Sequence, residues 1–290
     1  MNACQPLGRT RHSPLTGVNY TGHISRLMHD IVARVPSLNF IDLDRVLVFA
    51  RPGRTGADGP YASCHCLTLP DSDPGYFFWR DRQSGRITRR SDWFVTKSPR
   101  VAVDGAQIAY LISFAIPRFC DQSLTRSRKR TLYPEGTPAW VAKLDTVVHE
   151  LYHIDPSGAG LRVFERADGQ PSQSIHGPHF FEEVAAMVQH YLASAPDHEL
   201  LEFLHDDFSG LVARYGGIAG LTFRPFPSYP RRYREVLDPQ PAAPEIGEVQ
   251  VTPLDTCGVA TSFCETDLQM RQFFESGTRV APAIAPPIAA

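Results

Sequence analysis

Apolar residues recur at intervals of three and four positions in four stretches of the chain, the spacing that places them on one face of a helix. The stretches cover residues 23–35, 138–154, 181–192 and about 197–215. Thr137 and Pro138 predict the start of the second helix, because threonine caps a helix and a proline in its first turn needs no N–H partner. Pro36 ends the first helix and Gly216 the last. The pattern therefore predicts four helices.

Short runs rich in β-branched and aromatic residues lie between the first two predicted helices, and such runs are typical of strands. They cover residues 45–50, 61–68, 76–79, 93–95 and 108–116. A polar turn at 83–85 joins two of them into a predicted hairpin. A helix followed by strands and then by helices predicts an α+β fold, with a small mixed or antiparallel sheet packed against the helices.

The composition changes near residue 225, where prolines become frequent, and the chain ends in a stretch rich in alanine and proline. We therefore divide the chain into a flexible N-terminal segment at 1–22, one folded domain at 23–224, and a tail at 225–290. The tail is expected to be largely extended or disordered. The middle part is long enough to enclose one hydrophobic core.

The charges are nearly balanced, with 29 Lys and Arg residues against 31 Asp and Glu residues and a formal charge of −2. This balance gives no general reason to expect binding to nucleic acid. The basic run Arg126–Arg130, with Arg86, Arg89 and Arg90, could bind phosphate, although a solvated loop is the competing interpretation. Nucleic acid is therefore not an expected partner, but the basic run leaves the question open.

No apolar stretch approaches the roughly 20 residues of a membrane-spanning helix, so no membrane association is expected. The start of the chain also has no apolar block of the length that a secretory signal needs, so we expect a cytoplasmic protein with reduced cysteines. Cys64 and Cys66 are the only close pair of the six cysteines. They could approach a metal from one face of a strand, but no second well-spaced pair completes a structural zinc site. We interpret them as incidental thiols.

The segment His149-Glu150-Leu151-Tyr152-His153 has the form HExxH and lies in the second predicted helix. Residues four apart stack on one helix face, so both imidazoles can reach one Zn²⁺ while Glu150 projects beside its bound water. At about 100° per residue, His153 lies about 40° from His149, whereas the apolar residues of this helix lie about 140–220° away. The metal face is separate from the core face, and the motif predicts a catalytic metal site.

A catalytic zinc site needs a third protein ligand and an open position. His176 precedes Pro178, on backbone that Gly177 can bend toward the motif, and His179 lies in the first turn of the next helix. A carboxylate such as Asp168 or Glu183 is a further alternative. The expected geometry favours His176 over His179.

Other stretches accompany the motif, namely Leu111–Phe119, Lys143–Pro156, Gly160–Arg162 and His176-Gly177. Together they resemble a family of metallopeptidases found in phages and bacteria, and His176–Phe180 is more distantly similar to the HGxxF segment of SprT-like minimal zincins. The resemblance covers about residues 40–225. It implies a zincin-like fold, one catalytic Zn²⁺, a peptide or protein substrate, and His176 as the third ligand.

These features predict a zinc-dependent metallopeptidase in which Glu150 is the general base for a metal-activated water. Arg162, Tyr152 and His179 have the chemistry to stabilise the oxyanion that forms during hydrolysis. Asp145 lies one turn before His149 and could orient a ligand imidazole, although a solvated charge is the alternative.

Two other functions stay open. A zinc-bound interaction module, such as a DNA-associated accessory protein, would have the fold without useful turnover, and a metal-dependent hydrolase could act on a non-peptide amide. Glu150 favours an enzyme over the first alternative, because a purely structural zinc site needs no base. The strand at 108–116 is predicted either to offer an edge to an extended peptide or to be buried. The oligomeric state is not predicted.

Overall fold

The computed structural model describes residues 17–56, 58–67, 76–80, 87–94, 100–158, 160–164, 176–223, 233–234 and 262–274. For residues 76–80, 87–94, 100, 233–234 and 262 it describes the backbone alone. Most of the predicted N-terminal segment and tail lies outside the described residues, as do Arg86 and Asp168.

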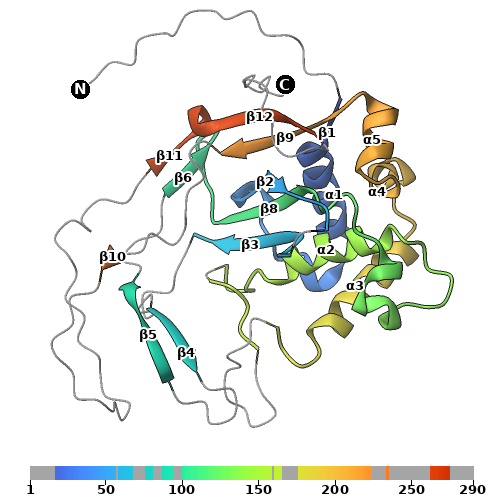
Figure 1. Ribbon diagram of the computed structural model, residues 1–290. Helices are drawn as coiled ribbons and strands as arrows, with labels where there is room; N and C mark the ends of the chain where they lie inside the picture. Colours follow the sequence, from blue (N-terminus) through green and yellow to red (C-terminus); the bar gives the residue numbers. More distant parts are fainter. Residues whose placement is uncertain are drawn as a thin grey trace, which may run out of the picture.

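Five α-helices and four small three-stranded sheets make up the described part of the chain, which is therefore an α+β fold (Figure 1). In the central sheet, β8 (Tyr110–Pro117) lies between β2 (Val46–Gly53), to which it is parallel, and β3 (Ala62–Cys66), to which it is antiparallel. The prediction of a small mixed sheet is confirmed. Because β8 is paired on both sides and every residue in it is buried, the prediction that it offers a free edge is wrong.

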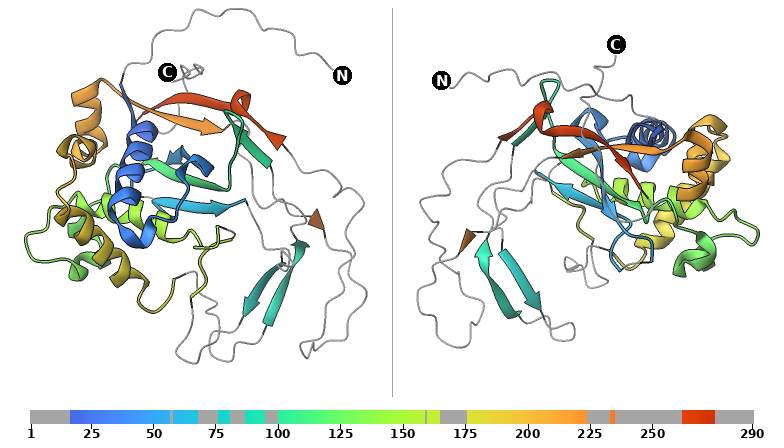
Figure 2. Two further views of the ribbon diagram at one scale, coloured as in Figure 1. Left: turned by 180° about the vertical axis from the view of Figure 1, so that it is seen from behind. Right: turned by 45° about the horizontal axis from the view of Figure 1, so that its top comes forward.

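Helices α1 (Tyr20–Arg34) and α2 (Val141–Tyr152) cover one face of the central sheet, and α3 (Phe180–Ala193) packs against α2 (Figure 2). Alternate strand residues, such as Val48, Ile112 and Cys66, face these helices and belong to the larger of two hydrophobic cores. Every residue of α2 except His149 is buried. The helix that carries the motif is therefore enclosed on nearly all sides.

The opposite face of the central sheet packs on a smaller core, to which Phe49 and Leu111 contribute together with Phe223 of β9 (Ile218–Phe223) and Leu268 of β12 (Leu268–Phe273). Strand β12 pairs antiparallel with β9 along its whole length. The prediction of an extended or disordered tail is therefore wrong for these residues. The backbone groups of β12 are satisfied by pairing with β9, which lies far away in the sequence. A prediction from the local proline-rich composition cannot include such a partner.

The N-terminal boundary also differs from the prediction. Strand β1 (Val18–Asn19) pairs in parallel with β9, and α1 begins at Tyr20, which is fully buried. The last residues of the expected flexible segment thus belong to the fold. The Asn19 side chain accepts a hydrogen bond from the Gly22 backbone N–H at 3.0 Å and so caps α1.

Two smaller sheets complete the described strands. The predicted hairpin is confirmed by the antiparallel pairing of β4 (Tyr76–Arg80) with β5 (Ile87–Phe94), and β10 (Tyr233–Arg234) pairs with β5. In the other sheet, β6 (Arg100–Val103) pairs with β7 (Ala106–Gln107) and β11 (Ser262–Phe263).

The predicted single helix at 197–215 is wrong, because the chain forms α4 (Glu202–His205) and α5 (Phe208–Tyr215) with a break between them. At the break Asp206 is extended, and the Asp207 carboxylate accepts a hydrogen bond from Gly210 N–H at 2.8 Å. This cap starts a new helix. Gly216, with φ of 77°, ends α5 as predicted.

The start of α2 is also later than predicted. Thr137 does not cap it, since its hydroxyl donates to the Pro134 carbonyl, and a tighter turn at 138–140 precedes Val141. Among the helices in the described part of the chain, none combines the length and the apolar content that crossing a bilayer requires.

The packing of β12 predicts different costs for two adjacent phenylalanines. Phe273 is 8% exposed in the larger core, whereas Phe274 is 41% exposed. Phe273→Ala should lower the free energy of unfolding by about 3 kcal/mol, because it leaves a cavity, and Phe274→Ala by less than about 1 kcal/mol. Urea unfolding of both variants measures this. Equal, small effects would contradict the docking of β12.

Candidate metal centre

Helix α2 presents His149 and Glu150 one turn before His153, which caps its C-terminal end. The next segment folds back on the helix, with Arg162 N–H donating to the His153 carbonyl at 2.8 Å. The Tyr110 hydroxyl of β8 donates to the Gly160 carbonyl at 2.9 Å and ties this segment to the sheet. The end of the motif is therefore fixed from both sides.

His176 approaches α2 from the segment before α3. Gly177 follows it and is buried against the Phe164 ring, where an added Cβ would lie 2.7 Å from ring carbons. Glycine is thus required here by close packing, which places the backbone of His176 next to the motif.

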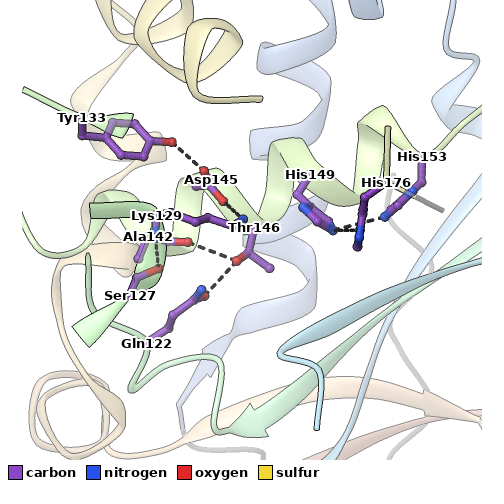
Figure 3. Close-up of polar contacts among 10 residues, drawn as sticks. All are labelled: Gln122, Ser127, Lys129, Tyr133, Ala142, Asp145, Thr146, His149, His153 and His176. Carbon is purple, nitrogen blue, oxygen red and sulfur yellow. Dashed lines mark hydrogen bonds and ion pairs between the residues drawn. The ribbon is translucent and has the colours of Figure 1, made fainter. Parts of the chain in front are cut away.

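The three imidazoles converge on one point (Figure 3). Nε2 of His149 lies 3.1 Å from Nε2 of His153 and 3.2 Å from Nε2 of His176. Two nitrogen ligands at about 2.0–2.1 Å from a tetrahedral zinc ion would be about 3.3–3.4 Å apart, so these separations fit a shared ion. One ring nitrogen offers a single lone pair or N–H, so His149 cannot hydrogen-bond fully to both neighbours. The group can hold a metal ion.

One buried ring touches all three imidazoles. Phe180, the first residue of α3, is fully buried, and its centroid lies 4.8 Å from that of His149, 4.9 Å from that of His153 and 4.7 Å from that of His176. In many metal sites a carboxylate or carbonyl holds the outer ring nitrogen, but Nδ1 of His149 and of His153 is buried without a hydrogen-bond partner. Packing on Phe180 therefore orients the rings.

The electrostatic environment keeps the imidazoles neutral. Burial lowers the pKa of His149 to about 2 and that of His153 to about 4, and it also lowers the pKa of His176. Neutral imidazole is the form that binds a metal. The site thus offers three unprotonated ligands at neutral pH.

Glu150 is 4% exposed and lies on the side of α2 that faces β3. Burial raises the pKa of its carboxyl to about 8, against the opposing effects of a hydrogen bond from the Cys64 backbone and the charges of Lys129 and Arg51. A divalent cation in the histidine group would favour the carboxylate. A buried acid is thus placed beside the metal ligands, as the motif predicts.

Asp145 does not orient a ligand imidazole, so that prediction is wrong. One oxygen of its carboxylate accepts a hydrogen bond from the Tyr133 hydroxyl at 2.6 Å, and the other pairs with the Lys129 ammonium (Figure 3). The alternative of a solvated charge is also wrong, because Asp145 is 1% exposed. Its partners come from the loop before α2, which the helical wheel cannot reveal.

The three predicted oxyanion donors lie elsewhere or are engaged. The Tyr152 hydroxyl donates to Glu183 of α3 at 2.6 Å. Glu183, the alternative third ligand, is therefore bonded to Tyr152. Arg162 donates through Nε to the Tyr152 carbonyl at 2.9 Å and stacks on the Tyr152 ring. His179 is exposed at the start of α3 and outside the metal group.

The remaining candidates are also placed. Cys64 and Cys66 lie on β3 and form no disulfide, and both are outside the metal group that the described residues form. Within the basic run, Arg128 is exposed and Arg130 donates to the carbonyls of Tyr133 and Pro134, whereas Lys129 turns inward. Sequence reasoning assigned no part in the metal site to Phe180 or Lys129, although Phe180 ends the HGxxF segment and Lys129 belongs to the basic run.

Comparison of the chain with models of known protein families, with curated proteins and with solved structures found no match. The family resemblance of the motifs is therefore a hypothesis, and the functional argument depends on the geometry of the described residues.

The geometry predicts which histidine variants lose the metal. His176→Ala should weaken binding of a divalent ion by more than about 100-fold. Losing a residue that only hydrogen-bonds to a metal ligand costs about 10–100-fold in affinity, and losing a ligand itself should cost more. His179→Ala should bind as the wild type does. Titration with Zn²⁺ against a chromophoric chelator measures both, and equal affinities would remove His176 from the site.

Ring packing predicts an effect of a residue that binds no metal. Phe180→Leu should weaken metal binding about 10–100-fold, the range for residues that orient ligands, because the imidazoles lose their common contact. Phe203→Leu, a substitution in the same core that contacts Tyr20 instead, is the matched control. The same titration compares them, and unchanged affinity in Phe180→Leu would refute the orienting role.

Proposed function

We propose that this chain is a zinc-dependent metallopeptidase with a zincin-like fold, related to the metallopeptidases that its motifs resemble. The observation that carries the proposal is the convergence of three neutral imidazoles next to a buried glutamate. A site that only holds a metal for stability needs no such acid. Burying a carboxyl costs free energy, so its presence beside the histidines favours a catalytic role.

The ligand set favours a catalytic zinc ion. Catalytic zinc sites combine three protein ligands, commonly histidines, with an open position, whereas structural sites are closed by four ligands that are mostly thiolates. The group formed by the described residues has three histidines and no cysteine. Zn²⁺ bound there would lower the pKa of a water molecule and polarise the carbonyl of the substrate.

Glu150 then acts as the proton carrier. Its carboxylate takes a proton from the attacking water and passes it to the nitrogen of the leaving amine. The buried position keeps bulk water away, and the Cys64 backbone hydrogen bond holds the carboxyl on the side of β3. The residue is thus fixed where a substrate lying between α2 and β3 would react.

Strand β3 is the edge on which we place the substrate. It is one of the two outer strands of the central sheet, and it lies along α2 (Figure 1). An extended peptide could add to this edge through backbone hydrogen bonds. A peptide that follows β3 would pass Glu150 with one of its peptide bonds. An open strand edge beside the acid therefore favours a peptide or protein substrate over a small amide.

The proposal predicts the behaviour of two carboxylate variants. Zinc-loaded wild-type protein should cleave members of a mixed peptide library, and Glu150→Gln should lower the rate about 10²–10⁴-fold with zinc retained, because it removes the proton carrier. Glu182→Gln removes an exposed carboxylate of α3 and should cleave as the wild type does. Mass spectrometry of the digest and zinc analysis measure both.

The alternatives give different results in the same experiment. Turnover of simple amides without cleavage of any peptide would indicate a non-peptide amidase. Zinc-loaded wild-type protein that cleaves neither would indicate an interaction module, and unchanged cleavage by Glu150→Gln would remove the proposed base.

A further inference from the structure

Hydrolysis of a peptide bond places negative charge on the carbonyl oxygen, and a side-chain donor near that oxygen accelerates the reaction. The donors that the motif suggested are engaged elsewhere: Tyr152 bonds Glu183, and Arg162 bonds the Tyr152 carbonyl. His179 lies outside the metal group. The guanidinium of Arg162 also stacks on the Tyr152 ring, where its Nη2 is buried without a hydrogen-bond partner. A cationic donor that is accessible to a substrate would therefore come from another element.

Lys129 is a basic side chain that the structure turns toward the site. It lies in a short 3₁₀ helix at Arg128–Leu132, where the Ser127 hydroxyl accepts from its backbone N–H at 3.2 Å. The side chain runs along α2 to Asp145, and its ammonium end lies on the side of His149 (Figure 3). The ammonium is also 5.2 Å from the centroid of Phe181, whose ring contacts His149 and His176.

Lys129 and Asp145 differ in exposure, and this difference suits Lys129 to act as a donor. The lysine side chain is 22% exposed, whereas the aspartate is 1% exposed. The carboxylate is buried and fixed by Tyr133 at 2.6 Å, so it holds the ammonium in place while the ammonium stays accessible. An ammonium has three N–H groups, and among the described residues only Asp145 accepts from it. Donor capacity is therefore available for a substrate.

The charge of Lys129 reaches every group of the site. Burial is the largest cause of each pKa shift in the site. The charge of Lys129 further lowers the pKa of His149, His153 and His176, and it opposes the raised pKa of Glu150. Two arginines act on single groups of the site: the charge of Arg162 also lowers the pKa of His153, and that of Arg51 also opposes the raised pKa of Glu150. Among the described residues, Lys129 is thus a cation whose charge acts on all four groups.

We propose that Lys129 is a catalytic residue that donates a hydrogen bond to the substrate carbonyl oxygen as that oxygen becomes negatively charged. This inference depends on the proposed peptidase function. When the water oxygen bonds to the carbonyl carbon, the π electrons of the C=O bond move onto the oxygen. Lys129 stabilises this charge and keeps its own proton, while Glu150 carries the proton of the water to the leaving amine. Asp145 and Tyr133 act as positioning residues for the ammonium.

The test compares Lys129→Met with Arg128→Met, which removes an exposed charge from the same 3₁₀ helix. Lys129→Met should lower kcat about 10²–10³-fold, the cost of losing one oxyanion donor, with KM within about threefold and zinc retained. Affinity for a peptide phosphonate, an anion with the tetrahedral shape of the reacting carbon, should fall by a similar factor. Lys129→Arg should recover much of the loss, and Arg128→Met should match the wild type.

A second comparison protects the test against unfolding, because Lys129→Met leaves the buried Asp145 unpaired. Lys129→Met combined with Asp145→Asn removes both charges, and Asp145→Asn alone is its reference. The combined variant should be about 10²-fold slower than this reference and should bind the phosphonate more weakly.

The outcomes separate the two proposals. Cleavage and phosphonate binding by Lys129→Met within threefold of the wild type, or no difference between the combined variant and Asp145→Asn, would overturn the role of Lys129 and leave the peptidase intact. Zinc-loaded wild-type protein that neither cleaves peptides nor binds the phosphonate would overturn both.

Discussion

The contact between one phenylalanine ring and three imidazoles determines the rest of the site. Phe180 lies within 4.9 Å, centroid to centroid, of His149, His153 and His176, and it is fully buried. Because it is the first residue of α3, the packing of α3 on α2 and the geometry of the metal ligands are one constraint. Ring packing is short-ranged and depends on shape, so a small shift of α3 would separate the three nitrogens that could hold an ion.

The sequence predicts the local part of the site well and the distant part poorly. His149 and His153 follow from helical spacing alone, since four residues make about one turn. The position of His176 before Pro178 favoured it over His179, the resemblance strengthened that choice, and it is the histidine that the structure brings to the pair. Lys129 could not be predicted, because a basic run gives no sign of which residue turns inward, and its partner Asp145 was expected either to orient an imidazole or to be a solvated charge.

The same limit applies to the fold. The helical pattern located α1, α2 and α3 to within a few residues, because their buried faces repeat along the chain. It missed β12, whose hydrogen bonds and burial depend on β9, and it missed the break at Asp206, where a side-chain cap competes with an uninterrupted apolar stripe. Features that depend on a partner far along the chain leave little trace in a local pattern.

The burial of charge in this site is an argument for function. Asp145 is neutralised by Lys129 and bonded by Tyr133, so its burial is compensated within the protein. Within the described part of the chain, Glu150 has the Cys64 backbone as its hydrogen-bond partner, and burial leaves its pKa raised to about 8. A carboxyl in this state destabilises the fold relative to an apolar residue unless a cation joins it. Three neutral imidazoles that converge beside it supply the place for that cation, and His149, which is only partly buried, lies where this place meets the solvent.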